Sequence, residues 1–286
     1  MRIAYQGEPG AFSEAAARKI DAVAELLPCH AFEDVFDAVN AERASYGVLP
    51  IENSIGGSIH RNFDLLLEHQ LLIVGEVEQP VVHNLLALQG TTMGMVKRVY
   101  SHPQALAQCD RFLRGLTGVE VIATYDTAGS AKLIVDEGLT DAAAIASARA
   151  AEVFGLATLH RAIQDYEHNV TRMIVIGPKP LSETPADKTS IVFSLSNEPG
   201  ALFKALSVFA LRGIDLTKLE SRPIPGRKWE YLFYADLAAA QDAVPCGRAL
   251  AHLTEFAPML RVLGSYPSCK TTATDKPAPQ TFENLA

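Results

Sequence analysis

The sequence predicts an α/β protein with a large region of alternating strands and helices, followed by a smaller unit of βαββαβ order. Over residues 1–178, short runs rich in β-branched residues alternate with segments whose apolar residues recur at helical spacing. This alternation predicts a mostly parallel sheet with helices on both faces. A polar stretch at residues 179–188 is expected to be a linker, and the ferredoxin-like βαββαβ order follows over residues 189–266.

The first elements follow from local signals. A strand is expected at residues 2–6. The glycine turn at residues 7–10 then leads to Ser13, which can cap a helix over residues 14–20. The other strands expected before the midpoint of this region are residues 23–29, 46–51 and 71–77, and the other helices are residues 32–41 and 60–68.

After a crossing near residues 78–80 the pattern continues and then returns through a strand at residues 171–177. Between them we expect an extended segment at residues 81–88, strands at residues 98–101, 120–124 and 142–146, and helices at residues 103–113, 127–137 and 148–154. A last strand that rejoins the first half predicts two lobes with a cleft and a hinge between them. The expected lobes are residues 1–78 with 160–178, and residues 79–159.

In the small unit, the expected strands are residues 189–195, 215–221, 231–237 and 262–266. One helix is expected over residues 200–212. The other presents an apolar face made of Cys246, Ala249, Leu250, Leu253 and Phe256. Residues 267–286 contain three prolines and little apolar content, so we expect a disordered tail there.

Composition excludes several classes of function. The 286 residues are 48% hydrophobic and 20% charged, which is ordinary for a soluble globular protein. A net charge of −8 argues against nucleic acid and anionic membranes as partners, although a local positive site could still bind an anionic small molecule. No apolar run approaches the ~20 residues that a membrane helix needs. The apparent strand at the start argues against a signal or transit peptide.

The cysteines and histidines predict no metal site. The four cysteines are far apart and form no CxxC pair, which fits a reducing compartment; they are Cys29, Cys109, Cys246 and Cys269. The histidines show no HExxH motif and no pair at helical spacing.

The strand entry at residues 169–177 is the strongest candidate for chemistry. It places Thr171 and Arg172 where a polar loop becomes a buried strand. Because side chains alternate along a strand, Thr171 and Met173 should share one face and Arg172 should lie on the other. Taken alone, the pattern is also compatible with a threonine and an arginine that merely cap the strand entry.

Four other motifs lie between a strand and the following helix, where ligands bind in open α/β sheets. They are residues 7–13, a glycine turn suited to an anion; residues 50–54, with Glu52, Asn53 and Ser54; residues 101–104; and residues 126–128, with Thr127. Each could be an ordinary turn or helix cap. Their equivalent positions predict that they meet at one edge or across one cleft.

Together these motifs resemble those of a prephenate dehydratase with an ACT regulatory domain, in the plant and bacterial versions that include arogenate dehydratases. The resemblance covers the chain except its tail. Its motifs are Tyr5-Gln6-Gly7 with Gly10 and Ser13, Pro50-Ile51-Glu52-Asn53-Ser54, Ser101-His102-Pro103-Gln104, Asn169-Val170-Thr171-Arg172, Gly200-Ala201-Leu202 and Glu220-Ser221-Arg222-Pro223.

The resemblance implies a two-lobed, periplasmic-binding-protein-like catalytic region and a ferredoxin-like βαββαβ ACT domain. It implies conversion of prephenate to phenylpyruvate with loss of water and carbon dioxide, without a metal or organic cofactor. It also implies feedback inhibition by phenylalanine, bound between ACT domains of a homodimer or homotetramer. The catalytic residues it indicates are Thr171, Asn53, Ser54, Thr127 and Arg172. The substrate-binding residues are Gln6, Gly10, Ser13, Glu52 and Met173, and the phenylalanine site comprises Asn197, Gly200, Ala201, Leu202, Glu220, Ser221, Arg222 and Pro223.

The chemistry gives these residues roles. Loss of water and carbon dioxide makes the ring aromatic, and the barrier is a poor leaving group. We expect Thr171 to donate a hydrogen bond to the departing hydroxyl. Backbone N–H groups of residues 7–13, with Asn53, Ser54 and Thr127, should bind the carboxylates. Arg172 is expected either to face the substrate or to brace the strand from behind.

Two alternatives remain. An arogenate dehydratase would run the same chemistry on an amino acid. A catalytically dead amino-acid sensor is the other alternative, and its one hint is Met173, where the family's Thr-Arg-Phe motif has phenylalanine. The expected location is the cytoplasm, or the plastid stroma if a plant-type precursor has lost its transit peptide.

Overall fold

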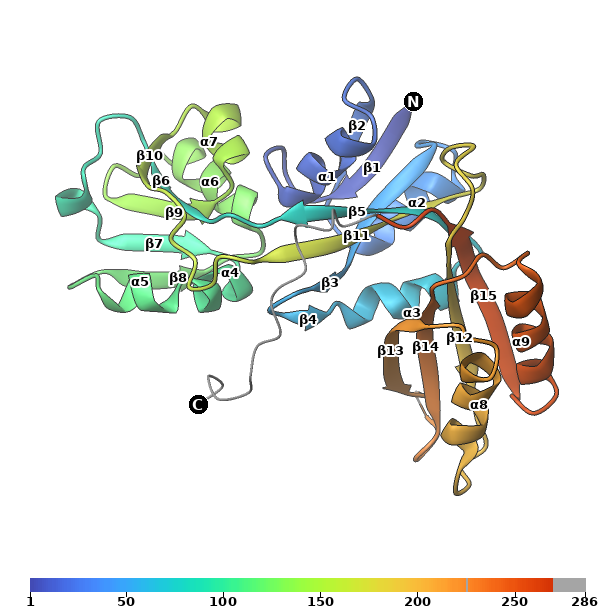
Figure 1. Ribbon diagram of the computed structural model, residues 1–286. Coiled ribbons are helices and arrows are strands. Elements are labelled where there is room, and N and C mark those ends of the chain that lie inside the picture. The colour runs from blue at the N-terminus through green and yellow to red at the C-terminus, as the bar shows by residue number, and fades with distance from the viewer. Residues whose placement is uncertain (225, 270–286) are drawn as a thin grey trace.

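The computed structural model describes residues 1–224 and 226–269, and its elements form three sheets (Figure 1). The expected tail at residues 267–286 lies mostly outside these residues. No helix in the described part of the chain is long and apolar enough to cross a membrane.

The first lobe is built on a mixed sheet of order β2-β1-β3-β11-β5, with β4 paired to β3. Its strands are β1 (Arg2–Gln6), β2 (Glu25–Cys29), β3 (Tyr46–Asn53), β4 (Gly57–Ser58), β5 (Leu72–Pro80) and β11 (Val170–Gly177), and its helices are α1 (Phe12–Ile20), α2 (Phe32–Asn40) and α3 (His60–Glu68). Strand β1 is parallel to β2 and β3, whereas β11 is antiparallel to β3 and β5. The return of the chain through β11 therefore inserts a late strand into the middle of an early sheet.

The second lobe holds a sheet of order β10-β6-β9-β7-β8. Its strands are β6 (Asn84–Ala87), β7 (Arg98–Ser101), β8 (Glu120–Ala123), β9 (Ala142–Ala146) and β10 (Ala157–His160). Its helices are η1 (Met93–Met95), α4 (Pro103–Gln108), α5 (Asp110–Arg114), α6 (Thr127–Asp136) and α7 (Ala148–Phe154). The single helix expected over residues 103–113 is wrong, because the chain leaves helical geometry at Cys109 and divides it into α4 and α5. Strand β10 was not predicted.

The buried strand β9 explains how helices cover both faces of this sheet. All five of its residues are buried. Ala142, Ala144 and Ala146 pack with α6 and α7, while Ala143 and Ile145 pack with α4 and the neighbouring turn. The period of two residues thus sends alternate side chains into two separate apolar clusters.

The third sheet is fully antiparallel, with order β13-β14-β12-β15. Its elements are β12 (Lys188–Ser194), α8 (Ala201–Ala210), β13 (Leu216–Pro223), β14 (Tyr231–Leu237), α9 (Val244–Thr254) and β15 (Met259–Tyr266). This is the expected βαββαβ order. Ile191 and Phe193 face the two helices, whereas Val192 belongs to the core of the first lobe.

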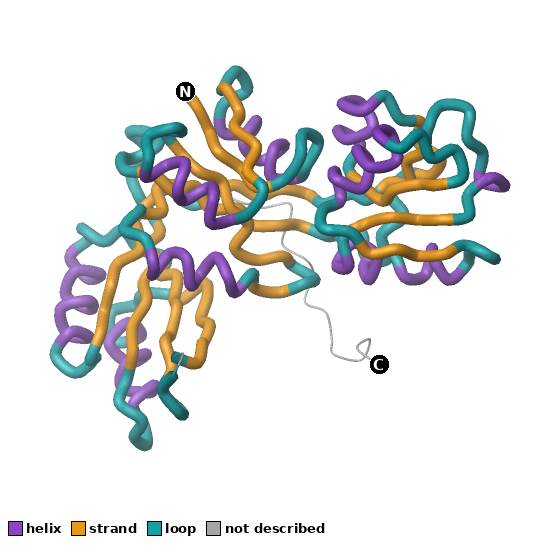
Figure 2. The backbone as a smooth tube through the Cα atoms, turned by 180° about the vertical axis from the view of Figure 1, so that it is seen from behind, coloured by secondary structure: helices purple, strands orange, loops and turns teal. Residues whose placement is uncertain are grey.

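The third sheet therefore packs directly on the first lobe, on the side away from the second lobe (Figure 2). The rings of Phe63 and Tyr234 lie 4.8 Å apart across this contact, and the Tyr234 hydroxyl donates to the carbonyl of Phe63. At Gly264 the two backbones approach so closely that a Cβ atom would lie 2.0 Å from the carbonyl oxygen of Ile73. Only glycine fits at this point of the interface.

Candidate active site

A cavity of about 400 Å³ lies between the two lobes. Side chains of both lobes and of the first crossing segment line it. Six of the predicted site residues are among them: Gln6, Ser13, Asn53, Thr127, Thr171 and Met173. The apolar part of the wall includes Phe12, Phe32 and Val81, so the cavity combines a few polar groups with surfaces that suit a carbon ring.

Two backbone N–H groups fix which side-chain atoms of this site donate hydrogen bonds and which accept them. The N–H groups of Ile55 and Gly56 donate to Asn53 Oδ1, at 3.0 and 2.7 Å. The amide nitrogen of Asn53 must therefore point the other way, and it donates to Thr171 Oγ1 at 3.0 Å. Because Thr171 Oγ1 accepts this bond, the hydroxyl hydrogen of Thr171 remains available to a ligand.

The same reasoning assigns the donors and acceptors of three further side chains. Asn53 Nδ2 donates to Asn169 Oδ1 at 2.7 Å, so Asn169 Nδ2 is the atom that donates to Gln108 Oε1, at 2.9 Å. Gln108 Oε1 is thereby an acceptor, and His83 Nε2, also 2.9 Å away, must carry the hydrogen between them. Burial lowers the pKa of His83, which favours the neutral ring with a bare Nδ1. That Nδ1 is buried and has no hydrogen-bond partner among the described residues.

Gln108 and His83 were not predicted, because a single neutral polar residue leaves no periodic signal. Two features of the chain could have indicated them. His83 lies in the first crossing between the lobes, and any crossing segment must border the cleft. Gln108 lies one helical turn after Gln104, on the helix that the motif at residues 101–104 begins.

Contacts between the lobes surround the cavity. The N–H of Glu8 donates to Asp126 Oδ2 at 3.2 Å, and Ser147 Oγ donates to the carbonyl of Gly10 at 2.6 Å. The rings of His30 and Tyr125 stack at 6.0 Å. The predicted convergence of strand-to-helix loops from the two lobes is therefore present in the structure.

Four of the predicted residues do not line the cavity. Gly10 packs against Ala150 at the contact between the lobes, where a Cβ atom would lie 2.7 Å from Ala150 Cα. The hydroxyl of Ser54 donates to the carbonyl of His168 and accepts from the N–H of Val170, so it joins two loops. The other two, Glu52 and Arg172, lie behind the cavity.

Arg172 faces away from the cavity because it alternates with Thr171 along β11. Its guanidinium lies 2.9 Å from Glu52, 3.1 Å from Glu76 and 2.8 Å from Asp236. Arg172 therefore does not face the cavity, and this corrects its predicted role in substrate contact. Its contacts support the other expected role, that of bracing the strand from behind.

We call this group the back-face cluster. Its members are Glu52, Glu76, Arg172, Lys188, Lys218 and Asp236. Glu76 and Asp236 are almost completely buried, with side chains 2% and 9% exposed. Lys218 lies on β13 and Asp236 on β14, so the cluster joins the strands of the site to the third sheet.

Met173 lies on the cavity side, as alternation predicts, and is 2% exposed. It packs in a cluster with Ile3, Val48 and alanines of α1. A flexible thioether adapts to irregular space, so methionine can take the place of an aromatic ring here.

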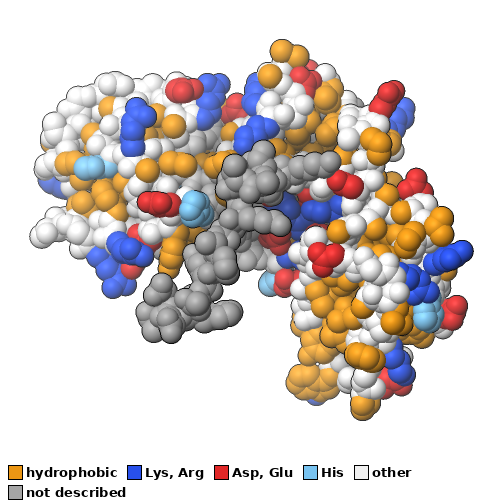
Figure 3. Space-filling model, viewed as in Figure 1, with side chains coloured by type: hydrophobic (Ala, Val, Ile, Leu, Met, Phe, Trp, Pro, Cys, Tyr) orange, Lys and Arg blue, Asp and Glu red, His pale blue; other side chains and the backbone are white. Residues whose placement is uncertain are grey.

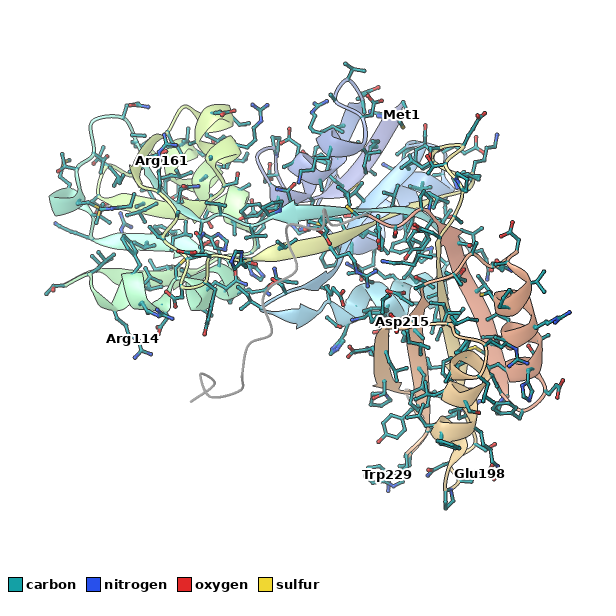
Figure 4. The ribbon with its side chains drawn as sticks, in the orientation of Figure 1. Met1, Arg114, Arg161, Glu198, Asp215 and Trp229 are labelled. Carbon is teal, nitrogen blue, oxygen red and sulfur yellow. The ribbon has the colours of Figure 1, made fainter. Side chains whose placement is uncertain are left out.

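The eight residues predicted for an effector fall into two groups. Asn197, Gly200, Ala201 and Leu202 lie where α8 begins, at the end of the third sheet that is marked by Glu198 and Trp229 (Figure 4). The others lie on β13. There the Glu220 carboxylate accepts from Ser58 at 2.9 Å, and Arg222 pairs with Asp64 on α3 at 2.7 Å. Within one chain, Glu220 and Arg222 thus face the first lobe.

The described residues contain no group of three or more histidine, cysteine or acidic side chains that could hold a metal ion.

Comparisons with known proteins agree with this arrangement. The family model described as prephenate dehydratase matches residues 3–181, and the one described as ACT domain matches residues 189–244. The chain is 51% identical to arogenate dehydratase/prephenate dehydratase 2, chloroplastic, of Arabidopsis thaliana, over 93% of this chain and 73% of that protein.

Two solved structures extend the likeness to the fold. Prephenate dehydratase from Arthrobacter aurescens, in complex with L-Phe, aligns with a TM-score of 0.86 at 32% identity, covering 98% of this chain and 92% of that one. A protein described as a novel type of quorum quenching acylase aligns with a TM-score of 0.84 at 37% identity, covering 94% and 98%.

Proposed function

The chain belongs to the prephenate dehydratase family and carries an ACT domain, and from this premise we propose that it removes water and carbon dioxide from prephenate or from arogenate. Prephenate would yield phenylpyruvate, and arogenate would yield phenylalanine directly. Both reactions make the ring aromatic, so the protein has to assist only the departure of the hydroxyl and of the carboxylate.

The observation that carries this proposal is the orientation of the Thr171 hydroxyl. Asn53 donates to Thr171 Oγ1, and the direction of that bond is set by the backbone N–H groups of Ile55 and Gly56. Thr171 is consequently a preorganised donor, directed at a position where a leaving hydroxyl develops negative charge. A threonine hydroxyl is too weak an acid to lose its proton unaided, so its role is polarisation or relay of a proton.

The walls of the cavity suit the other half of the reaction. Phe12, Phe32, Val81 and Met173 border it with apolar surface. A carboxylate held against such surface is less well hydrated than in water, and this favours its release of electrons as carbon dioxide leaves.

Turnover of prephenate and of arogenate by the purified protein tests the proposal. We expect product from at least one of them. The absence of product from both substrates, in a protein that still binds phenylalanine, would contradict the proposed catalytic function and support the sensor alternative.

The acylase to which the chain is similar suggests hydrolysis of an amide as a competing function. Such a reaction needs a nucleophile activated by a base. Here Thr171 Oγ1 accepts a hydrogen bond from the Asn53 amide, and no base contacts it among the residues that the structure describes. The geometry therefore favours a hydrogen-bond donor over a nucleophile.

We further propose phenylalanine as an inhibitor that binds the ACT domain. The support is the ACT match at residues 189–244 and the L-Phe complex of the similar Arthrobacter protein. Inhibition by phenylalanine, with binding measured by calorimetry on the same protein, tests this. Activity that is unchanged at saturating phenylalanine would remove the proposal.

A homodimer or homotetramer is proposed on the apolar surface of the third sheet. Hydrophobic side chains gather over this unit in Figure 3. Phe203, Leu211 and Trp229 are 75%, 82% and 70% exposed, and gathered apolar side chains of this kind often mark an interface between proteins. Light scattering of the purified protein decides between monomer, dimer and tetramer.

For location, we propose the cytoplasm, or the plastid stroma in a plant. The relative from Arabidopsis thaliana is named as chloroplastic. Fractionation of the source cells, followed by an activity assay, tests this.

A further inference from the structure

The fixed charge of the cavity distinguishes the two candidate substrates. Within the described chain, the side chains that line it include one carboxylate, Asp126, and no lysine or arginine. The two lining histidines do not supply a positive charge at neutral pH, because burial lowers the pKa of His83 and, against the opposing effect of Asp126, that of His102. The lining side chains thus contribute one negative charge.

Prephenate and arogenate differ at one position, next to the carboxylate of the three-carbon side chain. Prephenate has a ketone oxygen there, and its net charge is −2. Arogenate has an ammonium group, and its net charge is −1. A nearby carboxylate attracts an ammonium and offers it hydrogen-bond acceptors, whereas it repels the lone pairs of a ketone.

Asp126 has capacity for such a ligand. Its Oδ1 accepts from the N–H of Ala128 at 2.8 Å, which caps α6, and its Oδ2 accepts from the N–H of Glu8 at 3.2 Å. The hydroxyl of Thr127 also donates to Oδ1, at 3.5 Å. An ionised carboxylate accepts about four hydrogen bonds, so these three contacts leave room for one donor from the cavity. Asp126 is 8% exposed, and its carboxylate is held by both lobes, which makes it a rigid acceptor.

The position of Asp126 relative to Thr171 suits the two ends of the substrate. Asp126 contacts Glu8, just beyond the end of β1, and Thr171 lies on β11. Strand β3 lies between β1 and β11, so two strand spacings, about 10 Å, separate the strand that leads to Glu8 from the strand that carries Thr171. In arogenate the ring hydroxyl and the ammonium lie at opposite ends of the molecule. With Thr171 at the hydroxyl, the ammonium end is directed toward Asp126.

We propose that Asp126 binds the ammonium group of arogenate and thereby makes arogenate the preferred substrate of this cleft. This inference rests on the proposed dehydratase function and adds the residue that selects between its two substrates.

The test is the substrate preference of Asp126→Asn. Asparagine is nearly isosteric and remains a good helix cap, so the variant should fold. We expect the wild type to have the higher kcat/KM with arogenate. In D126N, kcat/KM for arogenate should fall at least about tenfold, while that for prephenate should stay the same or rise. Asp136→Asn is the matched control, because Asp136 lies on the same helix, pairs with Lys132 and does not line the cavity. It should leave the preference unchanged.

A loss of capping alone would lower both activities together, so the ratio of the two kcat/KM values separates recognition from structure. Equal losses for both substrates in D126N would overturn the proposal, as would a wild type that prefers prephenate. Asp126→Ser, which also caps a helix, must show the same change in ratio. If the wild type turns over neither substrate, the dehydratase function itself fails, and that result differs from a dehydratase whose preference ignores Asp126.

Discussion

The strands β3 and β11 carry two kinds of polar structure on their two faces. On the cavity face, Asn53 and Thr171 belong to a network of neutral side chains whose hydrogen-bond directions are fixed by backbone amides. On the opposite face, their neighbours Glu52 and Arg172 belong to the back-face cluster of charged groups. Glu52 directly precedes Asn53, and Arg172 directly follows Thr171. Because side chains alternate along a strand, these neighbours lie on opposite faces.

The contrast suggests why each kind of group is where it is. A neutral, preorganised donor can polarise a leaving hydroxyl without placing further charge beside an anionic substrate. Behind the strands, the charged groups of the back-face cluster join the first lobe to the third sheet. A buried ion pair is weak evidence for stability by itself. A role in holding the two units in one relative position explains the cluster better.

Removal of Arg172 should have the largest effect, and on stability. Arg172→Met leaves the buried carboxylates of Glu76 and Asp236 without their shared partner. Loss of one member of a buried pair costs about 3–5 kcal/mol. We expect the free energy of unfolding in urea to fall by about that amount.

Arg149→Met is the matched control for R172M. Arg149 pairs with Glu152 on the surface of α7, and both side chains are at least half exposed. A surface pair of this kind contributes at most ~1 kcal/mol, so the variant should be close to the wild type. Equal effects of the two substitutions would contradict the difference between the two faces.

Removal of the Thr171 hydroxyl should come next, and on rate. Thr171→Ala removes the preorganised donor, and one such donor is typically worth ~10²–10³ in kcat. Thr171→Ser retains the hydroxyl and should be milder. Stability should change little in either variant, because the network partners of Asn53 remain. An alanine variant with nearly full kcat would show that the leaving hydroxyl is assisted elsewhere.

The sequence predicted that side chains alternate between two faces of this strand, but it could not show which face borders the cavity. The pattern at residues 169–177 predicted that Thr171 and Arg172 point in opposite directions, and they do. Which direction leads to the cleft depended on Asp236 and Lys218, which lie far along the chain on the third sheet. Two polar residues at a strand entry look alike until such partners are known.

The fold was predicted more fully than the site, for a physical reason. Apolar periodicity repeats over many residues, so it indicates strands such as β9 and the βαββαβ unit. The network through Asn169, Gln108 and His83 depends on single neutral side chains that the fold brings together from distant parts of the chain, and single residues leave no periodic signal. Short elements such as β4 and β10 were missed because they present too few residues for a period to show.

A smaller effect is expected on regulation. The Asp236 carboxylate links β14 of the third sheet to Arg172, next to Thr171. If phenylalanine acts through this contact, Asp236→Asn should weaken inhibition by roughly 5–150-fold, which corresponds to a coupling of ~1–3 kcal/mol. Binding of phenylalanine itself, measured by calorimetry, should persist.

Arg261→Met is the control for D236N. Arg261 donates to the carbonyls of Leu67 and His69, so it joins the same two units without touching β3 or β11. It should retain inhibition. Full inhibition of D236N would assign the coupling to another contact of this interface.

The smallest expected effect is on the pH dependence of stability, which should differ between the two faces. Burial raises the pKa of Glu52, but Arg172 and Lys218 lower it more, so it lies below its ordinary value of 4.5. Burial lowers the pKa of His83 below its ordinary value of 6.5. In both cases the folded protein binds fewer protons than the unfolded chain, so stability falls as the pH drops below the ordinary value.

The cavity face should therefore begin to lose stability below about pH 6.5, and the back face only below about pH 4.5. His83→Gln can still donate to Gln108 and does not titrate, so it should flatten the curve of unfolding free energy just below pH 6.5. Glu52→Gln should flatten it only below pH 4.5. Urea unfolding at a series of pH values measures both. If His83→Gln left the slope below pH 6.5 unchanged, His83 would not be held neutral in the folded protein.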